Sequence, residues 1–396
     1  MTVRTDADTS TWLAAIGDVV VQHPAGGDDS LRRLLAGAQV SFGNLEVPLT
    51  TSGIAAEKAA THRADPNRVT DLREMGFDVV TLANNHMLDY GVEGLRDTIV
   101  AVESAGLGHV GAGENAAEAR RPLLHPTPTG MVAFVGLCAA LPPGFAATAD
   151  RPGVAPLRVM QQHSMDPVLA AEQPGMAPFV HTQAHGPDLE AACDAVRSAR
   201  ESADLLVVGV HWGVPFGFAA ASYGPLAEYQ RPSGHALVDA GADLVLGHHP
   251  HMVQPIEVYR GAVIAYSVGN YAFHNWDAFG PGATSSEEDI PDDGFLMAVP
   301  AAPYRSPFDA PETLDSVVIE VPKPRDGSSR VVRFVPTTMV DGDPVVPDEE
   351  RSRAILRRLV KPRLEAWDGG STPALSVRQD VHDGMTVGEV TCGPRD

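Results

Sequence analysis

The sequence predicts an α/β fold in which helices pack around a mixed β-sheet. Three short apolar runs indicate this fold, because each follows a stretch with helical character and reads as a strand buried on both faces. The runs cover residues 77–86, 203–213 and 242–251, and each has an aspartate near its start and a histidine near its end. Helix–strand alternation favours parallel pairing, which gathers ligands beyond the C-terminal ends of the strands.

Further elements complete the predicted fold. Apolar runs at 12–18 and 262–270 predict a first and a late strand. The stretch at about 139–188 is rich in proline and glycine and lacks periodicity, so we expect an insertion or lid that covers or borders the site. Two β-branched runs and an apolar helical pattern predict a C-terminal hairpin and helix at about 314–367. No linker is visible, so residues 1–396 are expected to form a single domain.

Charge and cysteine usage narrow the classes of function. The chain has 51 acidic and 29 basic residues, a formal net charge of −22, and such a surface repels nucleic acid and anionic lipid headgroups. No segment approaches the ~20 apolar residues of a membrane span, and no export signal is visible at the N-terminus. Three widely spaced cysteines suggest neither a disulfide framework nor a zinc knuckle. We therefore expect a cytoplasmic protein without membrane insertion.

Polar residues of the kinds that bind metals gather at the expected strand ends. They are Asp18, Glu46, Asn84, Asn85, His86, His211, His248, His249 and His251. Carboxylates and neutral imidazoles bind Zn²⁺, Mn²⁺ or Fe²⁺, and an amide oxygen suits the harder ions. In an extended segment, His249 and His251 would point the same way and reach one site. A lone histidine is more often a packing residue and Asn-Asn-His can be a simple turn, but recurrence at three strand ends favours a metal site.

Other polar residues are assigned supporting or surface positions. Liganding imidazoles usually donate their second N–H, and Asp89 and Asp243 are candidate acceptors for His211 or His249 by proximity in sequence. Candidate substrate or supporting contacts are His248, Asp89, Ser267 and Asn270. Seven histidines in loops are expected at the surface or in the lid: His23, His62, His109, His125, His163, His181 and His185.

The chain resembles the poly-γ-glutamate capsule-biosynthesis (CapA-type) family across about residues 12–345. The segments that carry the resemblance are, in order, "GNLEVPLT", "FDVVTLANNHMLDYG", "VGVHWG", "DAGADLVLGHHPHMVQ" and "IAYSVGN". That family is similar to calcineurin-like metallophosphoesterases. The resemblance therefore implies a four-layered α/β/β/α sandwich with a two-metal site at the C-terminal ends of the strands.

The resemblance also implies roles for the residues at the strand ends. The implied ligands are Asp18 and His251 for a first metal, Asn85, His211 and His249 for a second, and Glu46 as the bridge. His86 takes the place of the histidine that protonates a leaving group, and Asn84 is grouped with it as a catalytic candidate. The expected cofactor is one or two ions of Mn, Zn or Fe.

The chain departs from the phosphoesterase pattern at two points and from the CapA-type pattern at one. Those enzymes carry Asp-x-His at the first strand, whereas two valines follow Asp18, so the first metal lacks a ligand unless Gln22, His23 or another segment supplies it. Glu46 replaces the usual bridging aspartate. No acid follows the His-Trp-Gly segment until Glu228, although one is common there in CapA-type sequences.

The leading hypothesis is a soluble metal-dependent hydrolase that cleaves an amide (γ-glutamyl-like) or phosphoester bond in a small or peptidic substrate. One well-held ion beside a histidine suffices to activate water towards a carbonyl, so amide cleavage is preferred. The alternatives are a non-hydrolytic component of poly-γ-glutamate synthesis or export, a tailoring enzyme of a biosynthetic pathway, and a binding module with a degenerate metal site. The missing membrane anchor argues against a role in capsule assembly.

Overall fold

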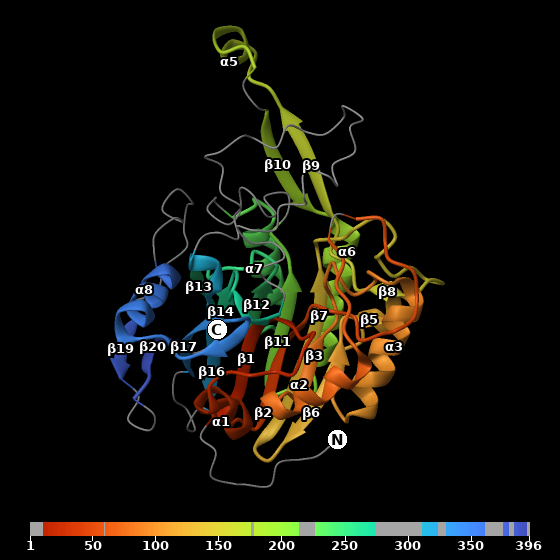
Figure 1. The fold of residues 1–396 in the computed structure, drawn as a ribbon. Coiled ribbons are helices and arrows are strands. Elements are labelled where there is room, and N and C mark those ends of the chain that lie inside the picture. The colour runs from red at the N-terminus through yellow and green to blue at the C-terminus, as the bar shows by residue number, and fades with distance from the viewer. Residues whose placement is uncertain are drawn as a thin grey trace, which may run out of the picture.

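Two β-sheets face each other at the centre of the structure, and helices cover their outer faces (Figure 1). The predicted α/β/β/α architecture is therefore confirmed, whereas the single mixed sheet expected from strand patterns alone is replaced by two sheets. The structure, a computed structural model, describes residues 11–58, 60–175, 178–213, 226–274, 311–323, 330–360, 375–379 and 384–393.

The first sheet is built on parallel strands that lead to the site. These are β1 (Thr11–Val20), β2 (Val40–Leu45), β3 (Val79–Thr81) and β4 (Gly108–Val110), in that spatial order. Beyond β1 the sheet continues antiparallel through β16 (Asp315–Pro322), β17 (Arg330–Val340), β20 (Thr386–Cys392) and β19 (Ser376–Gln379). Two short strands join it: β15 (Asn270–Phe273) beside the end of β1, and β18 (Asp343–Val345) beside β17.

The second sheet has six strands with a parallel centre. Their order is β13 (Ile256–Tyr259), β14 (Ala262–Ala265), β12 (Leu244–His248), β11 (Leu205–His211), β7 (Gly130–Cys138) and β6 (Leu123–Thr127). The middle four strands are parallel and fully buried along most of their length, as expected of continuous apolar runs. The inner faces of the two sheets form one core, in which Phe42 and Phe134 stack with ring centroids 4.9 Å apart.

Helices complete the outer layers. On the first sheet lie α1 (Asp29–Gly37), η1 (Pro66–Arg68), α2 (Val69–Met75) and α3 (Gly91–Ser104). On the second lie α6 (Gly186–Arg200) and α7 (Gln230–Ala240), while α4 (Ala116–Ala119) precedes β6, η5 (Pro311–Leu314) precedes β16, and α8 (Glu349–Leu359) packs on β16, β17 and β20. Within the described ranges, no helix has both the length and the apolar character that crossing a bilayer requires.

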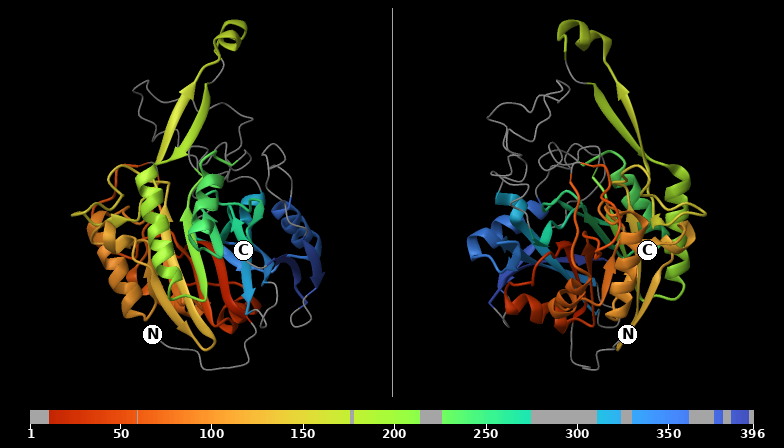
Figure 2. Two further views of the ribbon diagram at one scale, coloured as in Figure 1. Left: turned by 180° about the vertical axis from the view of Figure 1, so that it is seen from behind. Right: turned by 45° about the vertical axis from the view of Figure 1, so that its right-hand side comes forward.

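The insertion at about 139–188 is more regular than its sequence suggests. Strands β9 (Val159–Ser164) and β10 (Phe179–Ala184) form an antiparallel hairpin that projects away from the sandwich, with α5 (Pro167–Glu172) near its tip (Figures 1 and 2). Asp166 begins α5 by accepting hydrogen bonds from two backbone amides, and Pro167 fits the first helical position. Short β5 (Ala112–Gly113) and β8 (Gly153–Val154) pair below the hairpin.

Candidate metal centre

Two clusters of buried ligand-type side chains meet where the C-terminal ends of parallel strands from both sheets come together. Cluster I contains Glu46, His211 and His249, and cluster II contains Asp18, Glu46 and His251. Within each cluster the ligand atoms lie within 4.8 Å of one another, and Glu46 belongs to both. Asn85 adjoins cluster I, because its Oδ1 lies 2.6 Å from His211 Nε2. The structure thus brings together the six residues predicted as metal ligands.

Strand pairing delivers the carboxylates to this point. Asp18 lies near the end of β1, in register with Asn44 on β2 and with Asn270 on β15. Glu46 follows β2 directly, and its backbone N–H donates to the carbonyl of Val19 at 2.9 Å. Pairing with β1 therefore continues past the end of β2 and fixes Glu46 beside Asp18.

The loop after β12 is not extended, contrary to the prediction made from the spacing of its histidines. His249 and His251 have positive φ angles of 93° and 53°, so the chain turns sharply around Pro250. Such backbone conformations cost on the order of 1–3 kcal/mol and persist only where the surroundings impose them. Part of that support is a hydrogen bond from the His249 amide to Asp18 Oδ2 at 3.2 Å. As a result, the two rings enter different clusters instead of one.

Glu46 provides the test of whether these residues suit a cation. Its side chain is fully buried, and neither carboxylate oxygen accepts a hydrogen bond from the part of the chain that the structure describes. Burial and, secondarily, Asp18 raise the pKa of Glu46 well above its usual value. A charged carboxylate that is buried without hydrogen bonds is costly unless a positive charge compensates it. The donor set therefore fits one or two divalent ions, and Glu46 is the carboxylate that two ions would share.

The histidines of cluster I are ready to act as ligands. Burial lowers the pKa of His211 to about 3. Burial, followed by the neighbouring His211 and His251, lowers the pKa of His249 well below its usual value. Both rings are therefore neutral at pH 7, which is the form that binds metals. His211 Nε2 lies 3.3 Å from Glu46 Oε1.

Cluster II holds an ion pair. Burial alone would raise the pKa of Asp18, but the hydrogen bond with His251 and the surrounding histidines lower it below its usual value. Burial opposes a charged His251, yet Glu46, Asp18 and Asn270 raise its pKa to about 9. His251 Nδ1 lies 3.4 Å from Asp18 Oδ2 and 2.8 Å from Asn270 Oδ1. Asn270 thus positions a candidate ligand, a supporting role consistent with its sequence assignment.

His86 lies beside the clusters in a network of which the sequence predicts only a part. Its Nδ1 is 2.6 Å from Asp89 Oδ2, so Asp89 supports His86 and not His211 or His249 as predicted. Lys58, which was missed, lies 2.6 Å from Asp89 Oδ1. The prediction that His62 is a surface or lid residue is wrong, because its buried ring packs 4.1 Å from that of His86. No periodic pattern marks Lys58 or His62, which lie in an irregular segment.

Several other candidates have structural positions. The Asn84 amide donates to Asn44 Oδ1 at 3.0 Å and to the Leu45 carbonyl at 2.7 Å, and its oxygen accepts from the His86 amide. Asn84 therefore shapes the turn that presents His86. Asn44, also missed, donates to Asp18 Oδ1 at 2.8 Å. The signal for it was available, since alternation along a strand places Asn44 on the same side as Glu46.

The remaining predicted contacts lie around the centre. Buried His248 places Nε2 3.3 Å from the Ile16 carbonyl and so links the two sheets. Ser267 is buried, and its carbonyl accepts from the Gln254 amide at 2.9 Å. Asp243 is not a partner of the histidines as predicted, because it pairs with arginines that include Arg200 at 2.7 Å.

Gln22 and His23, the two residues suggested as a substitute ligand for the first metal, do not enter cluster II. Gln22 Nε2 donates to the Arg63 carbonyl at 3.0 Å. The exposed His23 ring stacks on His274 with centroids 3.5 Å apart. Cluster II therefore has Asp18, His251 and the shared Glu46 as its ligand-type groups within the described ranges.

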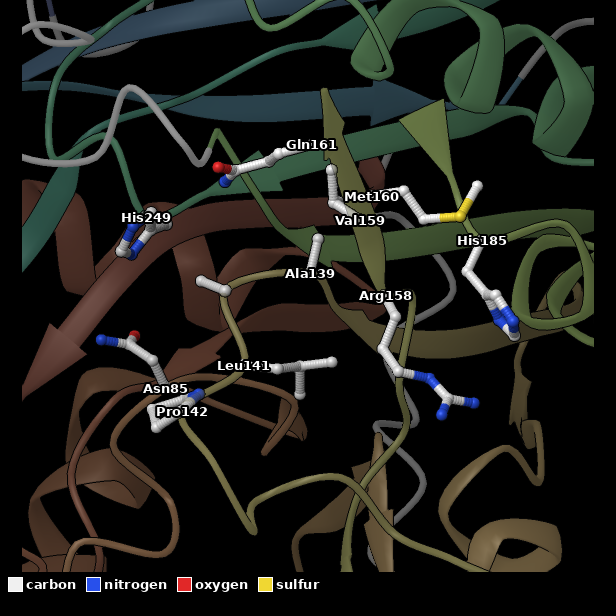
Figure 3. Close-up of a pocket in the computed structure, with 11 residues that line it drawn as sticks. Asn85, Ala139, Leu141, Pro142, Arg158, Val159, Met160, Gln161, His185 and His249 are labelled. Atoms are coloured by element: carbon white, nitrogen blue, oxygen red, sulfur yellow. The ribbon is translucent and has the colours of Figure 1, made fainter. Parts of the chain in front are cut away.

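A cavity of about 670 Å³ opens beside cluster I. Asn85 and His249 line one end, and Arg158 and His185 lie at the other (Figure 3). The wall between them is largely apolar and includes Ala139, Leu141, Pro142, Val159 and Met160, with Gln161 above. Ala140 also lines the cavity. Most of this wall comes from the insertion, whose base therefore borders the site. The volume is within the range of small-molecule pockets.

Fold and site together define an α/β/β/α protein with a candidate two-ion centre at the strand ends. The sequence model described as "Bacterial capsule synthesis protein PGA_cap" matches residues 13–275. This match covers well over half of the chain and includes every residue of both clusters, so the chain belongs to the PGA_cap family. The family predicted from the sequence is confirmed.

The chain is similar to several known proteins, and the fraction of each protein that the similarity covers differs. The PGA biosynthesis protein CapA of Bacillus subtilis (strain 168) is 28% identical over 379 residues, which cover 92% of this chain and 82% of that protein. The capsule biosynthesis protein CapA of Bacillus anthracis is 34% identical over 239 residues, 58% of this chain and 49% of that protein. The crystal structure of a phosphatase from Mycoplasma pneumoniae aligns with a TM-score of 0.35 and 11% identity, covering 82% of this chain and 86% of that one.

Proposed function

We propose that the protein is a metal-dependent hydrolase that cleaves an amide, γ-glutamyl-like bond in preference to a phosphoester bond. The observation that carries the proposal is the pair of buried clusters that share Glu46. Asn85, Glu46, His211 and His249 would hold one Mn, Zn or Fe ion, and Asp18, Glu46 and His251 a second. Ions bound there would polarise the scissile bond and lower the pKa of water for attack.

His86 supplies proton transfer in this proposal. Burial, followed by Lys58 and neighbouring histidines, lowers the pKa of His86 well below its usual value, so the ring is neutral at pH 7. Nδ1 lies 2.6 Å from the carboxylate of Asp89, which only accepts, and 3.3 Å from Lys58 Nζ, which only donates. The shorter contact, to Asp89, favours a proton on Nδ1. Nε2 is then an acceptor that takes a proton from the attacking water and passes it to the leaving group. Asn84 acts indirectly, because it holds the turn at His86.

The cavity supports an amide substrate of γ-glutamyl type. Such a group has an aliphatic spacer between its amide bond and its carboxylate. The apolar wall suits the spacer, and Arg158 at the far end suits the carboxylate. Arg158 also binds Asp188 through Nε and Nη2, each at 2.7 Å, which fixes its guanidinium in place.

The asymmetry of the clusters supports one tightly held ion. Cluster I with Asn85 offers four protein ligands, whereas cluster II offers three and shares one of them. In-line phosphoryl displacement benefits most from two ions that stabilise the entering and leaving oxygens. A single ion beside His86 is sufficient for attack on a carbonyl.

The test is a parallel assay with a γ-glutamyl anilide and an aryl phosphodiester, at zero, one and two equivalents of Mn²⁺ or Zn²⁺. We expect anilide cleavage that saturates near one equivalent. His86→Ala is the matched variant: it should keep its metal and lose about 10²–10⁴-fold in turnover. Phosphodiesterase turnover that requires the second equivalent, without anilide cleavage, would overturn the preference.

The family supports a second candidate, a non-hydrolytic role in poly-γ-glutamate synthesis or export. Its relatives include proteins named for PGA and capsule biosynthesis. In that case the metal-loaded protein would bind oligo-γ-glutamate without shortening it. Size analysis of the oligomer after incubation separates this role from hydrolysis.

A further inference from the structure

Lys58 places a positive charge directly beside the candidate metal centre. It lies between β2 and η1, and its side chain is 18% exposed. Its Nζ donates at 2.6 Å to Asp89 Oδ1 and at 2.6 Å to the backbone carbonyl of Asn85, and it lies farther, at 3.3 Å, from His86 Nδ1. The ring of Phe145 lies across from it, with the centroid 5.5 Å from Nζ. An ammonium held from three sides is fixed in position, unlike a typical surface lysine.

Asp89 connects this charge to His86. Its carboxylate is fully buried, and Oδ2 accepts from the His62 amide at 2.7 Å and lies 2.6 Å from His86 Nδ1. Within the described part of the chain, the Nε2 atom of His86 has no hydrogen-bond partner. The network therefore uses one ring nitrogen of His86 and leaves the other for a substrate or a water molecule.

The charge of Lys58 bears on which ring nitrogen of His86 carries the proton and which stays free as an acceptor. A buried carboxylate without a cation tends to take up a proton, because burial disfavours its charged form. Burial indeed raises the pKa of Asp89, and Lys58 is the leading influence that opposes the rise. A protonated Asp89 can donate its proton to His86 Nδ1, which would leave an N–H at Nε2 and remove the acceptor.

We propose that Lys58 is a positioning residue that acts through Asp89 and Asn85. It keeps Asp89 as a hydrogen-bond acceptor, which fixes His86 with its proton on Nδ1 and its lone pair on Nε2. It also holds the backbone of Asn85, whose side-chain oxygen lies 2.6 Å from His211 Nε2 in cluster I. The proposal rests on the proposed function for the role of His86, but the state of the ring can be measured without any substrate.

A purely structural Lys58 would do something different. It would neutralise Asp89 and support folding, and its removal would lower stability without changing the tautomer of His86. The two roles are separated by a readout that reports on the ring itself. The conservative Lys58→Arg keeps the charge, and Lys58→Met and Lys58→Gln remove it. Lys323→Met is a matched lysine control near Trp12, at the N-terminal end of β1 and away from Asp18.

The experiment is ¹⁵N NMR of histidine-labelled protein, metal-free and Zn²⁺-loaded, with the His86 signals assigned from His86→Gln. We expect the Nδ1–H form in wild type, Lys58→Arg and Lys323→Met, and a shift towards Nε2–H in Lys58→Met. Turnover of the γ-glutamyl anilide should fall about 10- to 100-fold in Lys58→Met, with KM within about threefold, and recover in part in Lys58→Arg. If Lys58→Met does not fold, Lys58→Gln takes its place.

Two results would overturn the proposal. One is a folded Lys58→Met or Lys58→Gln protein in which His86 keeps the wild-type tautomer. The other is a Lys58→Arg protein that matches Lys58→Met in both tautomer and turnover. If wild type cleaves neither test substrate, the proposed hydrolase function fails, and the NMR comparison still decides the positioning role. Asp89→Asn adds a check, because losses that act through one carboxylate should not add in the double variant.

Discussion

Cluster I and cluster II share Glu46 but differ in their readiness for a cation. In cluster I, burial has already removed the protons from His211 and His249. In cluster II, Asp18 and Glu46 keep a proton on His251, whose pKa is raised to about 9. Histidines that are equally buried therefore have pKa values shifted in opposite directions, because the number of carboxylates beside each imidazole differs. An ion entering cluster II therefore competes with the proton on His251, whereas the histidines of cluster I hold no proton for an ion to displace.

The largest effect should come from the shared residue. Glu46→Gln removes the negative charge common to both clusters while keeping the size of the side chain. We expect loss of both equivalents of metal in elemental analysis and a loss of activity of about 10³-fold or more, the scale of removing a main electrostatic stabiliser. Retention of one full equivalent would show that the clusters are independent and that Glu46 does not join them.

Removing one ligand from each side should separate the clusters. His249→Ala is expected to eliminate the tightly bound ion and most of the activity, whereas His251→Ala should remove only the weaker ion. Isothermal titration of metal-free protein with Mn²⁺ measures both affinities. Circular dichroism of the two variants controls for folding, since both side chains are buried. Equal losses in the two variants would contradict the asymmetry.

The two ions should respond differently to pH. An ion entering cluster II displaces the proton of His251, so its affinity should rise about tenfold per pH unit between roughly 6.5 and 9. The histidines of cluster I hold no proton in this range. Any proton on Glu46, whose pKa is raised, is displaced by either ion, so the affinity of the cluster I ion should rise less steeply with pH. In metal-free protein the charged His251 stabilises the fold below pH 6.5, and this contribution is lost as the pH rises through about 9. Parallel slopes for the two ions would argue against this view.

The smallest effect concerns the residue that orients His251. Asn270→Ala removes the oxygen 2.8 Å from His251 Nδ1 and should weaken the second equivalent of metal by about tenfold, as losses of supporting contacts often do. The first equivalent should bind as in wild type. Asn44→Ala is the informative companion, because Asn44 contacts both Asp18 and His211 and should therefore affect both ions.

The strand ends were predictable because their signal is local. Continuous apolar runs that end in acids, amides and histidines predicted the ends of β1, β3, β11 and β12, and parallel pairing brings such ends together. The division into two sheets was not predictable from these runs, since each strand reads the same in either sheet. Only the resemblance to a family implied it.

The parts that escaped prediction depend on contacts distant in sequence. Lys58 and His62 reach His86 from an irregular segment 31 and 27 residues before Asp89, and no periodicity marks such a segment. The turn at His249 and His251 could not be predicted, because sequence spacing alone cannot reveal positive φ angles. The hairpin of β9 and β10 could not be predicted, because the proline and glycine of the segments around it obscure two short strands.

The origin of the cavity wall has a consequence for how such a protein diversifies. The ligand-type residues sit on the ends of core strands, whereas Leu141, Arg158, Val159 and Met160 come from an insertion between β7 and α6. Changes in the length or sequence of that insertion can reshape the pocket without altering either sheet. Under the proposed function, the ion-binding residues and most of the pocket wall would thus belong to separate parts of the chain, and exchanging residues 139–188 between relatives would test whether that wall selects the substrate.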